Sequence, residues 1–175
     1  MEIFLSNRKF FLLILGIALI YCSCSSVQSE PYNLPYNARV LLSGDSVKTW
    51  KLAQRYNNRT RMNMGDCFLS YRQTFGFDGT VQDNSGENKD CGETLYGQWK
   101  FAKTGEGDYY LKIESDQLPE LMNIEEDFKL FKILNLTDSM LTLQFQHKQF
   151  SNKTSTITDF LVPESVSVTD RNFHW

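Results

Sequence analysis

The sequence has little histidine and cysteine, and it lacks a long apolar run. Only His147 and His174 occur among its 175 residues, which excludes a histidine-rich metal centre. The 4 cysteines stand in two unlike pairs, a pattern that argues against a zinc ribbon. We therefore expect no metal site and no cofactor.

An excess of charge of one sign is also missing. The chain carries 18 Lys and Arg against 21 Asp and Glu, a formal net charge of −3, so we expect no basic surface for nucleic acid. Hydrophobic residues make up 41% and aromatic residues 14% of the chain, enough for a packed core. This length and composition predict one folded domain.

The N-terminal segment has the features of an export signal. Arg8 and Lys9 precede an apolar run over residues 10–21. A run of about a dozen residues is too short for the roughly 20 that a membrane-spanning helix needs. We interpret residues 1–23 as a signal peptide.

Two cysteines, Cys22 and Cys24, follow this run directly and resemble a bacterial lipoprotein signal. Cleavage before a lipidated cysteine needs a small preceding residue, which Ser23 supplies for Cys24, whereas Tyr21 precedes Cys22. We predict lipidation of Cys24, with Cys22 as the alternative site. A secretory signal with incidental cysteines, or an uncleaved anchor, are the other interpretations. Acyl chains on Cys24 would hold the protein at a membrane of the bacterial envelope, expected to be the outer membrane.

Residues 24–36 are small and polar, with Pro31 and Pro35, and are expected to be a lipidated tether. Residues 37–175 form the predicted domain. It begins with one or two helical turns over residues 37–44, where Asn37 is a candidate N-cap and Gly44 a candidate C-cap.

The rest of the domain alternates apolar and polar residues, which is typical of strands. The expected strands cover residues 49–56, 68–77, 80–83, 95–101, 109–114, 128–136, 140–148 and 155–163. Asp78-Gly79 predicts a type I′ hairpin turn with positive φ at both residues. Residues 114–127 are a long loop over a barrel mouth or contain a short helix, and residues 164–175 are a ninth strand or a docked arm.

About eight strands in sequential hairpins predict an all-β fold, an eight-stranded antiparallel up-and-down barrel with a short N-terminal helix. Closure of the sheet removes both exposed edges. A two-sheet β-sandwich is the alternative, because strand spacing alone does not separate the two folds.

Cys67 and Cys91 begin the second and fourth expected strands, which lie at the same end of an up-and-down barrel. We predict a disulfide between them, since an exported domain is in an oxidising compartment. Closure of a loop of about 25 residues would stabilise the fold by roughly 3 to 4 kcal/mol. A reactive thiol pair is the alternative, but neither a nearby histidine nor a CxxC spacing would lower a thiol pKa.

Several short motifs occur in an order that resembles the bacterial lipocalin-like lipoproteins. They are Leu41-Leu42-Ser43-Gly44, Lys48-Thr49-Trp50-Lys51-Leu52, Asp66-Cys67, Phe77-Asp78-Gly79-Thr80, Cys91 and Gly97-Gln98-Trp99. The resemblance covers about residues 39–143. It implies a lipocalin-like barrel that binds a small lipophilic molecule or a partner protein, and it brings no catalytic residues. Gly44 and Trp50 are too far apart for the Gly-x-Trp of true lipocalins, so that packing is not carried over.

The candidate ligand-binding residues are those whose side chains are expected inside the barrel. The aromatic candidates are Trp50, Tyr71, Phe75, Trp99, Phe101 and Phe145, and the polar ones are Gln54, Gln73 and His147. A pocket needs a few orienting polar groups among apolar walls. The alternative is that the aromatic side chains simply fill a small barrel, with the polar ones in solvent at a mouth.

No acid, base or nucleophile stands in a recognised catalytic spacing, so we expect a protein that is not an enzyme. The sequence predicts a lipid-anchored envelope protein that binds a small apolar or amphipathic ligand. The alternative is a ligandless barrel that serves as an interaction or assembly module for an envelope protein. Its contact surface would be residues 114–127 or the aromatic tail.

Overall fold

The computed structural model describes residues 32–148 and 153–171. The chain divides into two units, Met1–Glu30 and Pro31–Trp175, and the fold below is that of the second. The predicted signal peptide, the lipidation of Cys24 and the last four residues lie outside the described residues.

Nine strands and a few short helices make up the described part of the chain. The strands are β1 (Val47–Asn57), β2 (Thr60–Arg61), β3 (Arg72–Gly76), β4 (Thr80–Asp83), β5 (Tyr96–Lys103), β6 (Tyr109–Glu114), β7 (Phe128–Leu136), β8 (Leu141–Lys148) and β9 (Thr154–Pro163). The helices are α2 (Ala38–Ser43), α3 (Asp66–Ser70), the 3-10 turn η1 (Ser85–Glu87) and α4 (Leu118–Met122).

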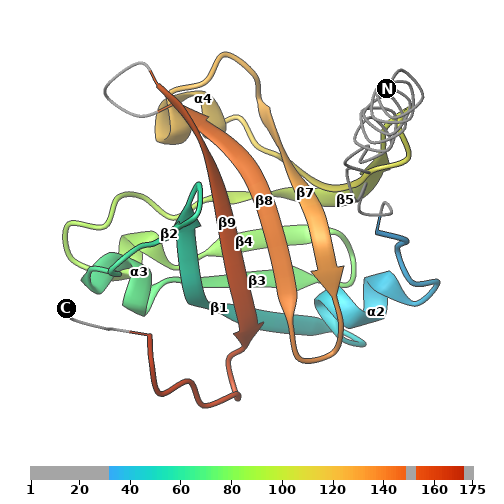
Figure 1. Ribbon diagram of the computed structural model, residues 1–175, viewed down its shortest axis with the longest axis horizontal. Helices are drawn as coiled ribbons and strands as arrows, with labels where there is room; N and C mark the ends of the chain where they lie inside the picture. The colour runs from blue at the N-terminus through green and yellow to red at the C-terminus, as the bar shows by residue number, and fades with distance from the viewer. Residues whose placement is uncertain (1–31, 149–152, 172–175) are drawn as a thin grey trace, which may run out of the picture. The chain divides into compact units, whose positions relative to one another are not determined.

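The sheet closes on itself. Its strands follow the order β2-β1-β3-β4-β5-β6-β7-β8-β9, and β1 pairs in addition with β9, always antiparallel (Figure 1). Eight strands, β1 and β3 to β9, therefore form an up-and-down barrel, while β2 only extends β1 at one end. The predicted barrel is confirmed, and the β1–β9 pairing excludes the two-sheet sandwich.

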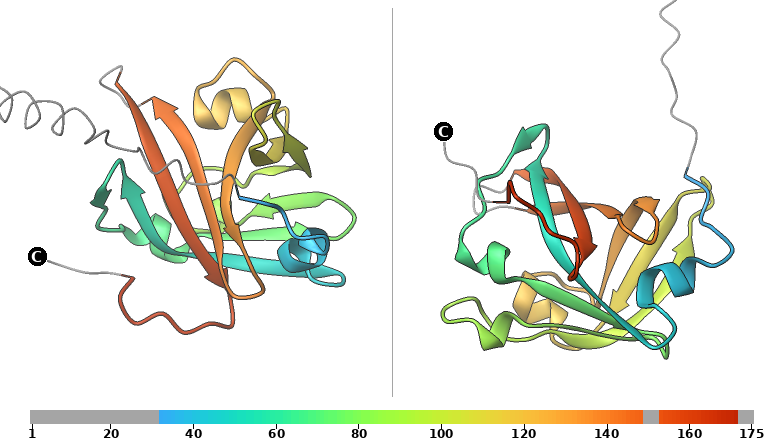
Figure 2. Two further views of the ribbon diagram at one scale, coloured as in Figure 1. Left: turned by 45° about the vertical axis from the view of Figure 1, so that its right-hand side comes forward. Right: turned by 90° about the horizontal axis from the view of Figure 1, so that it is seen from below.

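Helix α2 closes one end of the barrel, next to the start of β1 (Figure 2). Its Leu42 is fully buried, and the indole nitrogen Nε1 of Trp50 donates to the Leu42 carbonyl at 2.8 Å. The Nζ atom of Lys48 donates to the carbonyls of Leu41 and Asp138, which ties the helix to the β7–β8 turn. The predicted N-terminal helix is thus confirmed, and we call this end the closed end.

The opposite end, which we call the mouth, is flanked by α3 and α4. A disulfide joins Cys67 of α3 to Cys91, with the two Cα atoms 5.3 Å apart, as predicted. Helix α4 lies within residues 114–127 and buries Leu118, so the short-helix alternative is the correct one for this segment.

Three local predictions are wrong. Residues 66–70 form α3 instead of the beginning of a strand, because the chain crosses the mouth there before β3 begins. Strand β2 was missed; the turn before it contains Asn58 with a φ of 54°. In the β3–β4 turn only Gly79 has a positive φ, at 100°, so the turn is not type I′.

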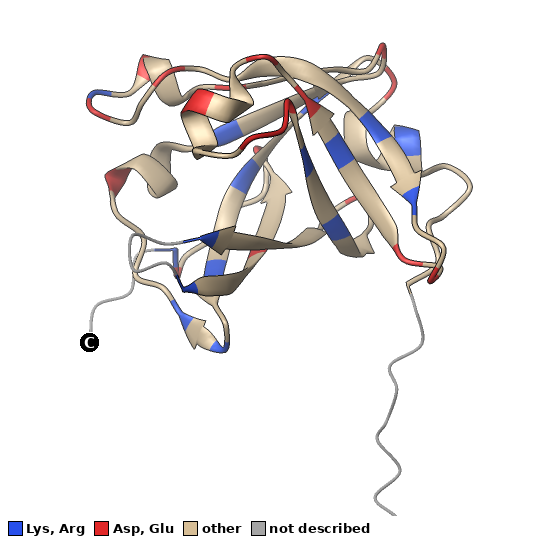
Figure 3. Ribbon diagram, turned by 90° about the horizontal axis from the view of Figure 1, so that it is seen from above, with Lys and Arg blue, Asp and Glu red and all other residues tan. Residues whose placement is uncertain are grey.

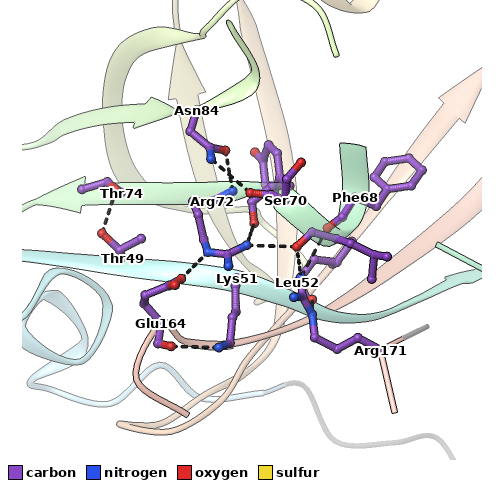
Figure 4. Close-up of polar contacts among 12 residues, drawn as sticks. Thr49, Lys51, Leu52, Phe68, Ser70, Arg72, Thr74, Asn84, Glu164 and Arg171 are labelled. Atoms are coloured by element: carbon purple, nitrogen blue, oxygen red, sulfur yellow. Dashed lines mark hydrogen bonds and ion pairs between the residues drawn. The ribbon is translucent and has the colours of Figure 1, made fainter. Parts of the chain in front are cut away.

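The C-terminal segment, residues 164–171, is a docked arm and not a strand. The main-chain carbonyl of Glu164 accepts a hydrogen bond from Lys51, and its carboxylate pairs with Arg72 (Figure 4). Arg171 donates to the carbonyls of Leu52 and Leu69, both at 2.7 Å. The arm therefore connects β1, β3 and α3.

Candidate ligand-binding site

A β-bulge changes which residues of β1 face the interior. The pairing of β1 with β9 shifts register between Leu52 and Gln54. Beyond the shift Arg55 lies opposite Asp159, which is buried, so both side chains point into the barrel. Gln54 lies opposite Phe160 on the outer face. The prediction that Gln54 faces the interior is wrong, because the inserted residue moves the alternation by one position.

Arg55 and Asp159 form a bidentate ion pair inside the mouth. The two N–O distances, from Nε to Oδ1 and from Nη2 to Oδ2, are both 2.6 Å. The Arg55 guanidinium also lies over the Phe68 ring, 4.4 Å from its centroid. Burial alone would lower the pKa of Arg55, but the hydrogen bonds and charge of Asp159 outweigh it and raise the pKa. Arg55 therefore stays charged inside a largely apolar wall.

Tyr71 and Asp83 add polar groups to the same region. Burial raises the pKa of the Tyr71 hydroxyl far above its ordinary value, and the Asp83 carboxylate adds to the effect. Burial also raises the pKa of Asp83, although the main-chain N–H groups of Ser85 and Leu95 donate to its carboxylate. Tyr71 is therefore a neutral hydrogen-bonding group at functional pH.

Two basic side chains complete the polar lining. Lys129 lies opposite Ile113, which is 1% exposed, so it belongs to the inner face of β7. His147 lies opposite the buried Ser155 on β9. Burial lowers the pKa of His147, and the charges of Lys129 and Arg55 lower it further. We call this group the mouth cluster: Arg55, Tyr71, Asp83, Lys129, His147 and Asp159.

The charge of the mouth is local, not part of a charged face. In the view of Figure 3, Lys and Arg lie mainly on strands and Asp and Glu mainly on turns and short helices. Within the mouth cluster Asp159 neutralises Arg55, while Lys129 donates only to a main-chain carbonyl, that of Gln146. Burial lowers the pKa of Lys129, and the carboxylate of Glu126, which also lines the cleft, acts in the opposite direction, so the Lys129 ammonium lies close to an acid of the same cleft.

Strands β7 and β8 separate at the mouth. Their pairing runs from Leu136 and Leu141 as far as Lys132 and Gln144 and stops, although both strands continue. Side chains span the gap instead: Lys129 Nζ lies 2.9 Å from the Gln146 carbonyl oxygen, and the rings of Phe131 and Phe145 pack with their centroids 5.1 Å apart. The barrel wall is therefore open along the mouth-side halves of these two strands.

A cleft of about 320 Å³ occupies this gap. Its lining consists of Tyr110, Ile124, Glu126, Phe128, Lys129, Leu130, Lys132, Gln144, Phe145 and Gln146. Phe145 and Lys129 come from the inner face, whereas Leu130 lies opposite Lys112 on the outer face. The cleft thus joins the outer surface to the mouth and offers apolar walls with a few polar groups.

The predicted ligand-binding residues divide between the two ends. Trp50, Phe75 and Trp99 are at most 3% exposed and belong to the packed core. Phe101 packs edge-on against Trp99, with ring centroids 5.3 Å apart, and Gln73 is 7% exposed.

Tyr71, His147 and Phe145 lie at the mouth, and of the predicted residues only Phe145 lines the cleft. Its ring packs against Phe131, with centroids 5.1 Å apart.

Sequence reasoning missed Arg55, Asp159 and Lys129. Strict alternation over residues 49–56 would place Arg55 on the face opposite to Trp50 and Leu52, and no residue type marks the bulge that reverses this placement. A signal for Asp159 was available: it is the single acid in the otherwise apolar phase of residues 157–161. A charge in that phase is rarely buried without a partner, so a search for a basic partner on the neighbouring strands would have found Arg55.

Among residues 32–148 and 153–171, no group of three His, Cys, Asp or Glu is placed to hold a metal ion. Nor does this part of the chain contain a helix long and apolar enough to cross a membrane.

The strand pairing defines the class of fold: a small closed up-and-down β-barrel of eight antiparallel strands. A lipocalin-like protein from Bacteroides uniformis ATCC 8492, known from a crystal structure, is similar with a TM-score of 0.46 and 17% sequence identity. The similarity covers 70% of this chain and 97% of that protein. No protein-family model and no curated protein matches the sequence. The barrel assignment rests on the strand pairing of this chain itself.

Proposed function

We propose that the chain binds a small amphipathic ligand at the mouth of the barrel, and that it is a binding protein without catalytic activity. The observation that carries the proposal is the cleft between β7 and β8, whose volume of about 320 Å³ lies within the range of small-molecule sites. The apolar part of the ligand would lie against Leu130 and Phe145. Its polar end would face Lys129, the one residue that the cleft lining and the mouth cluster share.

The closed end supports the same choice of site. A ligand among Trp50, Phe75 and Trp99 would have to displace side chains that already fill the interior. The mouth requires no such displacement, because the wall is already open where β7 and β8 are unpaired.

We further propose that the barrel is held at the bacterial envelope by a lipid on Cys24, at the outer membrane. The apolar run over residues 10–21 and the small Ser23 before Cys24 support this anchor. Metabolic labelling with a fatty-acid analogue tests it. We expect label on the wild type and none on Cys24→Ala; label that persists in Cys24→Ala would move the site to Cys22, and an unlabelled wild type would refute the anchor.

Native mass spectrometry of the protein purified from its own host tests ligand binding. We expect a co-purified small molecule on the wild type, and its loss in Leu130→Glu, which places a charge in the cleft. Met140→Glu is the matched control, because Met140 is 40% and Leu130 37% exposed and both belong to the β7–β8 hairpin region. The control should keep the ligand.

A protein that is repeatedly bare would argue against ligand binding and favour the alternative, an interaction module for an envelope protein. A ligand that stays bound in Leu130→Glu would place the site elsewhere in the barrel. The exposed side chains of Val47, Phe77 and Tyr96 would then be the first surface to test for partner contact.

A further inference from the structure

A second hollow lies on the outer face of the barrel, apart from the mouth cluster. Its volume is about 590 Å³, and residues of β3, β4, β5 and the end of β6 line it. The lining includes Gln82, Tyr96, Gly97, Gln98 and Asp116.

Tyr96 forms a fixed aromatic wall of this hollow. Its side chain is 60% exposed. Its main chain is held from both sides: the N–H donates to Gln117 Oε1 at 2.8 Å, and the carbonyl accepts from Ser115 Oγ at 2.6 Å. An exposed ring on an anchored main chain is available to a ligand at little cost in conformational entropy.

Two planar amides stand beside the ring. Gln82 lies directly opposite Tyr96 in the β4–β5 register, and Gln98 follows two residues further along β5 on the same face. Directly opposite side chains start about 5 Å apart, a distance comparable to one sugar ring. Both amides are exposed, and neither side chain hydrogen-bonds another residue of the described chain. Their donors and acceptors are thus free for a ligand.

The floor of the hollow is bare main chain at Gly97. A Cβ atom there would come within 2.5 Å of the Glu114 carbonyl oxygen, so a side chain does not fit without a shift of the backbone. Gly97 alternates with Tyr96 and Gln98 and lies opposite the buried Val81, so it contributes only its main chain to the hollow and lets β5 approach the end of β6 closely.

The charges of the lining select against anions. None of its residues is Lys, Arg or His, and its two acids are Glu114 and Asp116. Hydrogen bonds from Lys112 and Lys100 lower the pKa of Glu114, so it stays charged and paired. A phosphate or carboxylate would meet Asp116 without a cation in the lining to compensate. Val47, whose side chain is 59% exposed, adds an apolar contact beside these polar groups.

We propose that this outer hollow binds a neutral saccharide. The Tyr96 ring packs against the apolar C–H face of one sugar ring. Gln82 and Gln98 exchange hydrogen bonds with its hydroxyls, and the Asp116 carboxylate accepts from a further hydroxyl. A neutral, hydroxyl-rich ring with one apolar face matches two free amides and a carboxylate beside an exposed aromatic residue.

Saturation-transfer difference NMR on the full chain tests the site, with maltotriose, cellotriose and mannotriose at millimolar concentration as probes. We expect saturation transfer to the C–H protons of at least one trisaccharide. Tyr96→Ala should weaken the affinity about tenfold, while Tyr96→Phe should retain it. Tyr36→Ala is the matched control, because Tyr36 is an exposed tyrosine outside the hollow.

Absence of saturation transfer with all three probes would overturn the proposal. Saturation transfer and affinity that are equal in the wild type and in Tyr96→Ala would also overturn it. Folding of each variant is checked by its near-ultraviolet circular dichroism. Leu130→Glu should bind the saccharide like the wild type, which separates this site from the cleft at the mouth.

Discussion

The two ends of the barrel are built from the same alternating strands but are filled in opposite ways. At the closed end α2 covers the interior, and Trp50 and Phe75 are fully buried. At the mouth the inward positions carry an ion pair, a tyrosine, a lysine and a histidine, and β7 and β8 separate. The closed end is therefore filled by a packed core, and the mouth is the end at which we propose ligand contact.

The largest expected effect concerns the closed end. Trp50→Ala removes a fully buried side chain and its hydrogen bond to the Leu42 carbonyl, so we expect a loss of about 3–5 kcal/mol in the free energy of unfolding. Phe145→Ala at the mouth should cost only about 2 kcal/mol, since its ring is half-buried. Urea denaturation measures both. Equal losses in the free energy of unfolding for Trp50→Ala and Phe145→Ala would contradict the difference between the two ends.

The disulfide at the mouth should contribute the next largest effect. Replacement of both Cys67 and Cys91 by serine removes the cross-link, whose residues are 24 positions apart, and should cost about 3 kcal/mol. Reduction of the wild type should lower the denaturation midpoint to that of the double serine variant. A reduced protein as stable as the oxidised one would show that α3 is held at the mouth by packing alone.

The buried ion pair should behave asymmetrically. Asp159→Leu leaves the Arg55 guanidinium without its partner, and we expect it to cost about 2–4 kcal/mol. The double variant Arg55→Met with Asp159→Leu should recover most of that loss, because no charge then remains unpaired. Chemical denaturation of the wild type and of both variants measures the difference. If the double variant is less stable than Asp159→Leu, the unpaired charge of Arg55 is not the cause of the loss in that single variant.

The smallest effect is a pH dependence at His147. Its pKa in the folded protein lies below the ordinary value of 6.5, because of burial and then of Lys129 and Arg55. As the pH falls below about 6.5, His147 takes up a proton in the unfolded chain before it does so in the folded protein. The free energy of unfolding therefore decreases until the pH reaches the pKa of His147 in the folded protein. We expect a change well under about 1 kcal/mol, because the side chain is partly exposed. His147→Gln should flatten the stability profile between about pH 5 and 7, and an unchanged profile would exclude His147 as its source.

The regular part of the barrel could be read from the sequence. Strands β6 and β7 begin and end at the predicted residues, because their alternation is bounded by polar turns and an acidic segment. The disulfide followed from strand order, since the two cysteines belong to segments that meet at one end. Turns and periodicity are local properties, and the sequence shows them directly.

The content of the mouth could not be read in the same way. The bulge before Gln54 inserts one residue that no turn or glycine marks, and it reverses the inward positions of the rest of β1. The β7–β8 pairing contains a second register shift, between Ile133 and Asn135, and it ends at Lys132 and Gln144 although both strands continue. Both features are properties of pairs of strands, so a single strand's pattern does not predict them.

Hydrogen exchange with and without 1-anilinonaphthalene-8-sulfonate, an amphipathic anion, tests most directly that the mouth is the binding end. We expect added protection in residues 128–131 and 145–148, where β7 and β8 are unpaired, and none in residues 38–51 at the closed end. Protection that appears at the closed end instead, or an unchanged pattern when the dye is bound, would contradict the account.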